Sequence, residues 1–590
     1  MKYYADVVES LDLLDIGARL RENAGHLDAE QAGGRLASAA DLARDGLILA
    51  GMREQAIADS CLAGPAVLAA QQGTDWWANR LMSTALDSSA QGIAPDMRVS
   101  PAGDSLNRSE PSVRLLAEMG KLPTVVPEGY LFYGLFPEVY GALGHSLAVG
   151  WTGRPVVVVG VRSIGTSLSA AVSAGLRLGG CPVVRHTVRP TGDPFQRELV
   201  PDRSLMDHWQ QAAASGAQFV AVDEGPGLSG SSLAAVVQAF LRAGAMAERV
   251  TIVCADPPNH LPQASEAVRR LWETTAVHAA RPLIDVRLKG RLAGLLSSST
   301  GLPLTVLRDL SWGGWRVTTP PLLPHQERRK LLLWDGERRV LAKFVGFGEY
   351  GQVKARLAQR LASEGWSPAY RGFAHGFLLS NWEGDVGGAR DDQAARQAVL
   401  DAAPPYYAYL RRHCPAKVGV DFAELERIVA DTGMAWLGRS HAGLVRRMAA
   451  AAAGAGPRAL LGDQRPEPVE WVGRGSAILK CDAADHFLDH SWARNQDIAF
   501  DLAGFMELWA ITDQERGPLL NAYVSLSADP GVFTRLPLFR AVFAAHRLAM
   551  LDTAYHAGGS DPEGALDAER RRMGRMLAAS LTEPSSAPCG

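Results

Sequence analysis

The sequence predicts a multidomain protein of mixed α/β and α+β class. Three observations lead to this prediction. Residues 1–125 carry Ala, Leu, Asp and Arg at helical spacing, which predicts a helical N-terminal region. Residues 126–290 alternate short β-branched runs with helix patterns, which predicts a parallel-sheet domain. A proline-rich segment near 316–328 then leads into a hairpin pattern and a mostly helical remainder over 329–580, so residues 291–328 are a linker or the start of that last domain.

Bulk composition limits the classes of function. A chain of 590 residues favours two to four domains, and its formal charge of −3 gives no electrostatic reason to expect nucleic acid as a partner. The longest apolar runs are far shorter than the roughly 20 residues of a membrane span, and the start lacks a signal-peptide pattern. The six cysteines form no C-x-x-C pair and are expected to be reduced thiols. We therefore expect a cytoplasmic protein that acts on small molecules, and homo-oligomerisation remains open.

The first candidate site follows the run "FVAV" at 219–222. It consists of Asp223 and Glu224, then a loop of small residues and a helix that begins near Ser231. Ligands of open parallel sheets bind at the carboxyl ends of the strands. Backbone N–H groups at a helix start suit a phosphate, whereas the two acids suit sugar hydroxyls or water-bound Mg²⁺. A phosphorylated sugar would suit both the helix start and the acid pair. The alternative is a plain turn with a solvated acid pair.

A second loop repeats this design after the run at 156–161. "GVRSIGTS" places Arg162, Ser163, Gly165 and Thr166 between a strand and a helix, and it could hold another anionic group with Arg162 as a charged clamp. The loop nearly spells a nucleotide P-loop, but Thr166 stands where that motif requires lysine. Arg189 and Arg197 lie in a segment broken by Pro and Gly, which could close over the reacting centre or could be a surface loop.

Together the two loops resemble those of the type I phosphoribosyltransferases, whose fold is a parallel sheet under a small hood. The resemblance covers residues 126–260, with "VAVDEGPGLSGSS" as the binding motif for phosphoribosyl pyrophosphate. It implies that Asp223 and Glu224 bind the ribose hydroxyls, and that Arg162 and Ser163 contact a pyrophosphate bridged by Mg²⁺. The residues that it implies around the 5′-phosphate are Gly227, Ser229, Gly230, Ser231 and Ser232. Gly225-Pro226 is a one-residue expansion of the family pattern, which affects these phosphate contacts.

The C-terminal domain carries a second group of polar residues. Lys343 lies on the second strand of a hairpin around Asp335-Gly336, and a helix opens near Glu349. A strand lysine that meets nucleotide phosphates and is held by a helix carboxylate is the arrangement of kinases. Asp463 and Asp482 follow short apolar runs, so one could position a hydroxyl and the other could bind Mg²⁺.

Taken in order, these residues resemble the aminoglycoside-phosphotransferase type of kinase, a two-lobed protein-kinase-like fold. The resemblance implies that Lys343 contacts ATP, that Asp463 is catalytic and that Asp482 binds the metal, with 374–384 as the hinge. Two departures stand out: Leu461 replaces the usual histidine, and Pro468 replaces a metal-binding Asn, so Glu467 or Glu470 would substitute. "SWGGWR" at 311–316 is the candidate glycine-rich loop. His486 and His490, four residues apart, could bind a metal or could belong to a polar loop.

The functional prediction is phosphoribosyl transfer from phosphoribosyl pyrophosphate to an unidentified acceptor, coupled to a kinase-like nucleotide-binding domain. Two alternatives remain. One is a small-molecule kinase with a phosphosugar- or nucleotide-binding regulatory domain. The other is a noncatalytic nucleotide-sensing protein.

Overall fold

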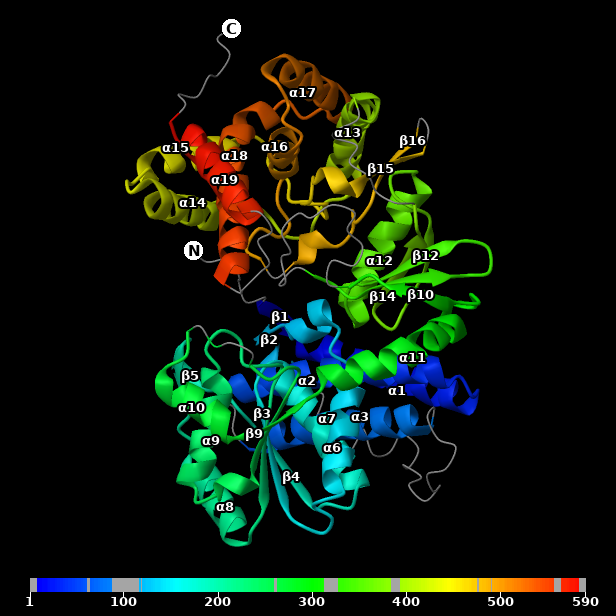
Figure 1. The fold of residues 1–590 in the computed structure, drawn as a ribbon, viewed down its shortest axis with the longest axis vertical. Coiled ribbons are helices and arrows are strands. Elements are labelled where there is room, and N and C mark those ends of the chain that lie inside the picture. Colours follow the sequence, from blue (N-terminus) through cyan, green and yellow to red (C-terminus); the bar gives the residue numbers. More distant parts are fainter. Residues whose placement is uncertain are drawn as a thin grey trace. The chain divides into compact units, whose positions relative to one another are not determined.

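The computed structural model describes residues 8–60, 64–87, 116–117, 119–258, 261, 263–311, 327–383, 393–474, 477–489, 491–556 and 564–582. The chain separates into two compact units, with the boundary between Leu304 and Thr305 (Figure 1). Residues 8–125, expected as a helical N-terminal region, therefore lie in the same unit as the parallel sheet. Within the described residues, no helix is both long enough and apolar enough to cross a membrane.

The first unit is built on a five-stranded parallel sheet of order β4-β3-β7-β8-β9. Its strands are β3 (Val156–Val161), β4 (Val183–Val188), β7 (Gln218–Val222), β8 (Val250–Cys254) and β9 (Ala276–Ala279). Every residue of β3, β7 and β8 is buried, as expected for β-branched runs covered by helices on both faces. The prediction of a parallel sheet over 126–290 is confirmed.

Helices cover both faces of this sheet (Figure 1). Side chains of β3, β7 and β8 form one core with α8 (Arg203–Ala214), α9 (Ser231–Arg242) and α10 (Glu266–Thr274). The other face carries α7 (Ile164–Leu178), against which α6 (Pro137–Ala148), α2 (Leu36–Asp59) and α3 (Pro65–Asp87) pack. The remaining elements are β1 (Val8–Asp12), α1 (Leu13–Ala32), β2 (Lys121–Val125), the π-helix Gly129–Tyr133, the hairpin β5 (Thr191–Asp193) and β6 (Gln196–Glu198), the short helix Ala247–Arg249, and α11 (Arg281–Thr300).

A buried ionic network fastens the N-terminal helices to the sheet. Arg185 on β4 forms a bidentate pair with Glu54 of α2, at 2.8 and 3.0 Å, and also contacts Asp75 of α3 at 2.6 Å. Arg44 of α2 pairs with Glu138 of α6 at 2.6 Å. Buried charges of this kind are tolerated only when paired and hydrogen-bonded. Helices α2 and α3 are therefore integral to the first unit.

The second unit begins with a five-stranded antiparallel sheet of order β10-β11-β12-β14-β13. Its strands are β10 (Thr305–Asp309), β11 (Lys330–Trp334), β12 (Arg339–Phe344), β13 (Tyr370–Ala374) and β14 (Phe377–Asn381), with α12 (Gly348–Ser363) packed against the last two. The predicted hairpin around Asp335-Gly336 is confirmed, because β11 and β12 pair with Trp334 opposite Arg339 and Gly336 takes a positive φ of 95°.

The rest of this unit is mainly helical. Its elements are α13 (Gln393–His413), α14 (Phe422–Leu437), α15 (Ala442–Gly454), the short helix Pro468–Glu470, the hairpin β15 (Trp471–Arg474) and β16 (Ala477–Lys480), the short helix His486–Leu488, α16 (Ile498–Leu508), α17 (Asp513–Ser527), α18 (Val532–His556) and α19 (Ala565–Ser580).

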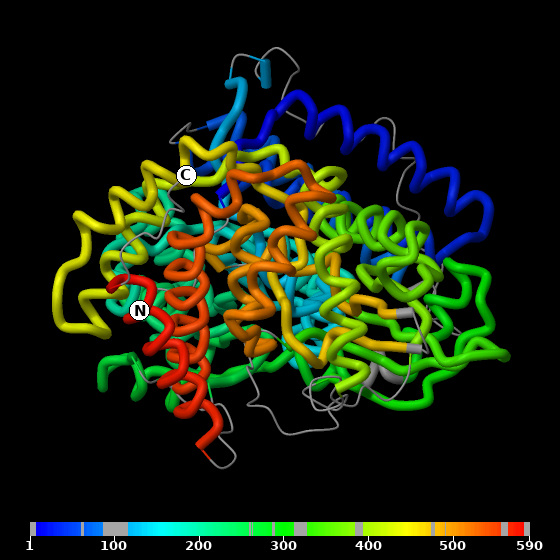
Figure 2. The backbone as a smooth tube through the Cα atoms, turned by 90° about the horizontal axis from the view of Figure 1, so that it is seen from above, coloured from blue at the N-terminus to red at the C-terminus, as the bar shows by residue number. Residues whose placement is uncertain are grey.

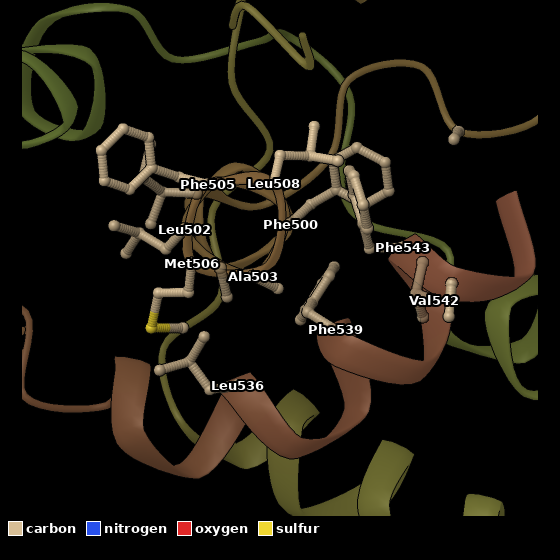
Figure 3. Close-up of a cluster of buried hydrophobic side chains, with 14 of the residues drawn as sticks. Phe500, Leu502, Ala503, Phe505, Met506, Leu508, Leu536, Phe539, Val542 and Phe543 are labelled. Carbon is tan, nitrogen blue, oxygen red and sulfur yellow. The ribbon is translucent and has the colours of Figure 1, made fainter. Parts of the chain in front are cut away.

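Helix α16 is the centre of the helical core. Figure 3 shows Phe500 of α16 beside Phe543 of α18, whereas Phe505 points away from α18 and contacts Tyr407 and Trp471. Helix α19 packs along α18 (Figure 2) and contributes Leu566, Met573 and Leu577 to the same core. Ten of the eleven residues of α16 are buried, so nearly its whole circumference is apolar apart from Asp501. Such a helix provides a rigid support for the loops that precede it.

Candidate functional site

A cavity of 160 Å³ lies between the antiparallel sheet and the segment 469–485 of the second unit. Its apolar wall includes Leu341, Val345, Leu361, Leu378, Val469 and Val472, together with the aromatic side chains Tyr370 and Trp382. Its charged lining includes Lys330, Lys343, Glu470, Asp482 and Asp485. Burial lowers the pKa of Lys330 to about 8, because the cavity wall removes water from its ammonium group. An apolar wall joined to a group of convergent charges is the usual chemistry of a small-molecule site.

Lys343 is the central cation of this cavity. It is the penultimate residue of β12, and its ammonium group contacts Asp482 and lies 2.8 Å from a carboxylate oxygen of Asp485. Burial opposes its charge, but the two carboxylates outweigh burial and raise the pKa of Lys343. The same pairing holds the pKa of Asp482 well below its usual value despite burial. The structure thus brings the predicted strand lysine and the predicted metal-binding aspartate into direct contact.

The predicted pairing of Lys343 with Glu349 is wrong. Glu349 is at the start of α12 but contacts Arg356 at 2.9 Å, and about half of each side chain is exposed. The side chain of α12 that reaches the ion pair of Lys343 and Asp485 is Lys354, whose ammonium group lies 2.5 Å from Asp485. Residues 349 and 354 differ by about 140° around a helix, so the two side chains leave α12 in different directions. Asp485, from the segment after Asp482, therefore contacts Lys343 where the prediction placed a carboxylate of α12.

Asp463, predicted as the catalytic aspartate, is fully buried and does not line the cavity. Its carboxylate lies 3.1 Å from the ammonium group of Lys480, the last residue of β16. That ammonium group also donates to Glu470 at 2.6 Å and to the carbonyl of Cys481 at 2.9 Å. Burial raises the pKa of Asp463 well above its usual value, although Lys480 opposes the shift. In this arrangement Asp463 faces a lysine of its own chain.

The predicted magnesium ligands Asp482 and Glu470 are neighbours. Ligand atoms of Glu470, Asp482 and His486 lie within 4.8 Å of one another. His490, the other histidine considered, is outside the described residues. Asp482 contacts Lys343, however, and Glu470 contacts Lys480. Because Mg²⁺ requires oxygen ligands in octahedral geometry, a site whose two carboxylates already hold ammonium groups and whose third group is an imidazole does not fit it.

In the first unit, the two predicted loops meet at the carboxyl edge of the parallel sheet. Asp223 and Glu224 follow β7, and Arg162 to Thr166 follow the neighbouring strand β3. A Cβ atom added to Gly165 would lie 2.7 Å from the carbonyl oxygen of Val222 and 3.4 Å from Asp223. Only glycine allows this approach. Ser163 has φ of 123°, a strained value for a residue with a side chain, and strain of this kind is concentrated at functional sites.

The acid pair is held in an environment that favours its neutral form. Burial raises the pKa of Asp223 to about 7 and that of Glu224 to about 8. The negative charge of Asp223 raises the pKa of Glu224 further, whereas Arg189 lowers the pKa of Asp223. The hydroxyl oxygen of Thr166 is buried and has no hydrogen-bond partner within the described part of the chain. Two protonatable acids and an unpaired hydroxyl at one sheet edge are characteristic of a ligand site.

Some hydrogen-bonding groups of the loop predicted to bind phosphate already bond to other parts of the chain. The hydroxyls of Ser229 and Ser231 donate to the carbonyl of Pro194, in the β5–β6 hairpin, at 3.2 and 3.0 Å. Gly227 and Gly230 have positive φ values of 57° and 67°, so the loop backbone requires glycine there. Ser232, in the first turn of α9, is half-buried. The hairpin therefore contacts the loop that was predicted to bind phosphate.

The predicted arginines have different partners in the structure. Arg162 contacts Asp59 of α2 at 3.0 Å, and Arg189 contacts the same carboxylate at 2.5 Å. Arg197 donates to the carbonyl of Gly192 within its own hairpin. Arg185, four residues before Arg189, is buried on β4. One carboxylate thus bridges the two arginines predicted for pyrophosphate.

Sequence reasoning missed Asp59, Lys354 and Lys480. Asp59 and Lys354 gave no local signal, since each is one charge on an amphipathic helix. Lys480 gave no such signal either, because β16 ends at Lys480 and Asp482 follows in a turn with φ of 60°, so strand alternation does not link the two. The candidate glycine-rich loop 312–316 lies outside the described residues, as does the end of the predicted hinge at Gly384.

No family model matches the sequence, and no curated protein matches it. Among solved structures, the choline kinase LicA from Streptococcus pneumoniae is similar over 50% of this chain and 99% of its own, with 14% identity and a TM-score of 0.34. A choline/ethanolamine kinase family protein from Mesorhizobium loti is similar over 51% and 96%, with 13% identity and a TM-score of 0.35. The ethanolamine kinase of Plasmodium vivax is similar over 54% of this chain and 94% of its own, with 8% identity and a TM-score of 0.31. Similarity at this level carries no argument about shared activity.

Proposed function

We propose that residues 305–582 form a nucleotide-binding unit of the kinase type, with ATP as its ligand. The observation that supports this proposal is the position of Lys343 at the end of β12, in contact with Asp482 and beside an apolar cavity. A flat base suits the wall formed by Leu341, Leu378 and Val472. The triphosphate then meets Lys343 and Lys330 at the charged end of the cavity.

Phosphoryl transfer to a small molecule is the activity that such a site would serve in a kinase. It requires a carboxylate that accepts the proton of the acceptor hydroxyl. Asp463, the sequence candidate for this role, is buried against Lys480. The geometry therefore supports nucleotide binding better than transfer, and the proposal is limited to binding.

Calorimetric titration of the full chain with ATP tests this proposal. The Leu378→Trp variant fills the cavity and leaves every charged residue in place, so we expect it to lose ATP binding. Leu241→Trp, a substitution at an exposed leucine in the first unit, serves as the matched control. Equal ATP affinity in the Leu378→Trp variant and the wild type would show that this cavity is not the nucleotide site.

The second candidate function is the binding of a phosphoribosyl donor at the edge of the parallel sheet. It is favoured by one specific observation, the close approach of Gly165 to Asp223, which joins the two predicted loops into one site. The acids would accept hydrogen bonds from ribose hydroxyls, and Arg162 would contact the pyrophosphate. Titration with phosphoribosyl pyrophosphate tests this candidate, with pyrophosphate release in the presence of nitrogen bases as the assay of transfer. Unaltered affinity in the Asp223→Asn, Glu224→Gln double variant would count against it.

A further inference from the structure

We infer that the nucleotide site of the second unit works without a divalent metal, because lysines of the chain occupy the positions that a metal would need. The inference rests on the proposed nucleotide binding and concerns how the charge of the nucleotide is balanced there. Four carboxylates line the cavity, Glu383, Glu470, Asp482 and Asp485. The last three are each in contact with an ammonium group of the same unit.

Lys480 is the first of these built-in cations. Its ammonium group lies between Glu470 at 2.6 Å and Asp463 at 3.1 Å, and its third hydrogen bond goes to the carbonyl of Cys481. All three donors of the ammonium group are therefore used. Its backbone N–H donates to the carbonyl of Trp366 at 2.8 Å, so the residue is fixed at both ends.

The surroundings of Lys480 prevent its release to solvent. The side chain is completely buried, and the buried aromatic group Tyr406, Tyr407 and Trp471 packs beside the acids that it contacts. A lysine that left this position would leave Asp463 buried without its cation, which the low-dielectric interior strongly disfavours. Lys480 is a permanent part of the site.

Lys343 is the second built-in cation, and it bridges Asp482 and Asp485. Asp485 is further compensated by Lys354, and the neighbouring Asp489 by Arg328 at 3.1 Å. A dication bound to Asp482 and Glu470 would have to displace Lys343 and Lys480 from them and remain beside two like charges. The position five residues after Asp463, where a metal-binding Asn would stand, is Pro468, which has no ligand atom in its side chain.

The cavity nevertheless offers positive charge to a triphosphate. Lys330 and Lys343 both line it, on the adjacent strands β11 and β12, and face each other in the register of the hairpin. Ammonium groups are effective point charges for phosphate oxygens. The ammonium groups at this end of the cavity are therefore the cations that nucleotide phosphates would meet, whereas a metal would find Glu470, Asp482 and Asp485 each engaged by a lysine.

Calorimetric titration of the wild-type full chain with ATP, once in excess EDTA and once in excess MgCl₂, tests this inference. We expect dissociation constants for ATP that agree within about threefold, because the same lysines would contact the phosphates in both conditions. Binding that weakens tenfold or more in EDTA overturns the inference and leaves the proposed nucleotide binding intact. Absence of ATP binding in both conditions overturns the proposed function itself.

Two variants examine the role of Lys480 directly. Lys480→Met frees the neighbouring acids Glu470 and Asp463 for a metal, so we expect ATP affinity to become at least tenfold stronger in MgCl₂ than in EDTA. Lys354→Met removes an equally buried lysine from the same ionic group but leaves Glu470 paired with Lys480, and we expect no such dependence. Equal metal dependence in both variants overturns the assignment of Lys480. If either variant does not fold, the wild-type comparison alone decides.

Discussion

The ammonium group of Lys480 and the carboxylate of Asp463 lie 3.1 Å apart, and neither side chain is exposed to solvent. The order of residues in the second unit predicts Asp463 as a proton acceptor, but this contact supplies it with a fixed partner. Proton transfer requires a carboxylate within hydrogen-bond reach of the acceptor hydroxyl. The proposed nucleotide binding at Lys343 therefore does not imply the predicted proton transfer at Asp463.

Removal of Lys343 should abolish the stabilisation of the second unit by ATP. In the wild type, ATP at a hundredfold excess over its dissociation constant is expected to add about 2.7 kcal/mol to the free energy of unfolding. The Lys343→Ala variant loses the cation nearest to the phosphates, so its melting temperature should not respond to ATP. Differential scanning calorimetry with and without ATP measures the response.

The matched control for this experiment is Lys417→Ala, because Lys417 is exposed and distant in sequence from the cavity lining. Its melting temperature should rise with ATP as in the wild type. Retention of the ATP response in Lys343→Ala would remove Lys343 from the site.

Arg185 and Arg197 should differ sharply in their effect on stability. Arg185 is buried between Glu54 and Asp75, so Arg185→Met leaves the buried Glu54 without its cation and Asp75 with Arg177 alone. Breaking a buried pair in this way costs about 3–5 kcal/mol. Arg197 bonds only within its exposed hairpin, and Arg197→Ala should change the free energy of unfolding by no more than about 0.5 kcal/mol. Chemical denaturation measures both, and similar values would contradict the structural role of Arg185.

The acid pair of the first unit should make its stability depend on pH. Burial raises the pKa of Asp223 to about 7 and of Glu224 to about 8, so the folded state favours their protonated forms. Their contribution is complete below about pH 4 and is lost as the pH rises through 7 and 8. Each tenfold difference in proton affinity between the folded and unfolded states corresponds to about 1.4 kcal/mol of stability. Melting temperatures measured from pH 5 to pH 8.5 should fall more steeply for the wild type than for the Asp223→Asn, Glu224→Gln double variant.

A double variant of two exposed carboxylates, Asp207→Asn with Glu248→Gln, serves as the control and should follow the wild type. Parallel pH profiles of the wild type and the Asp223, Glu224 variant would mean that the acids are not perturbed in the folded protein.

Asp59 should compete with anions for Arg162 and Arg189. Its carboxylate contacts both arginines, at 3.0 and 2.5 Å, so an incoming pyrophosphate must replace it. The Asp59→Asn variant removes the competing charge, and its affinity for inorganic pyrophosphate should rise on the order of tenfold, or about 1.4 kcal/mol. The control is Asp193→Asn, an exposed carboxylate of the β5–β6 hairpin that keeps its backbone hydrogen bond as an amide. An unchanged affinity in Asp59→Asn would place the anion elsewhere.

The sequence alone determined the strands of the parallel sheet and the first hairpin of the second unit, but not that the N-terminal helices share a unit with that sheet. Six consecutive buried residues in β3 and five each in β7 and β8 have the composition of covered parallel strands, so the sheet was predictable from local pattern. The Asp335-Gly336 hairpin was predictable because a turn of this type requires glycine at positive φ. The meeting of Asp223 with the loop after β3 followed from a general rule, since neighbouring parallel strands end at the same edge.

Only the tertiary structure decided which charges meet. Asp59 and Arg162 are separated by about a hundred residues, and Lys343 and Asp482 by more, so no local spacing encodes either contact. Whether Glu349 or Lys354 faces Asp485 depends on the rotation of α12 against the sheet, which packing fixes and composition does not. The burial of Asp463 depends likewise on Lys480 and on the aromatic group around it. Ionic partners are chosen by the folded interior, where the cost of an unpaired charge selects one arrangement from many that the sequence allows.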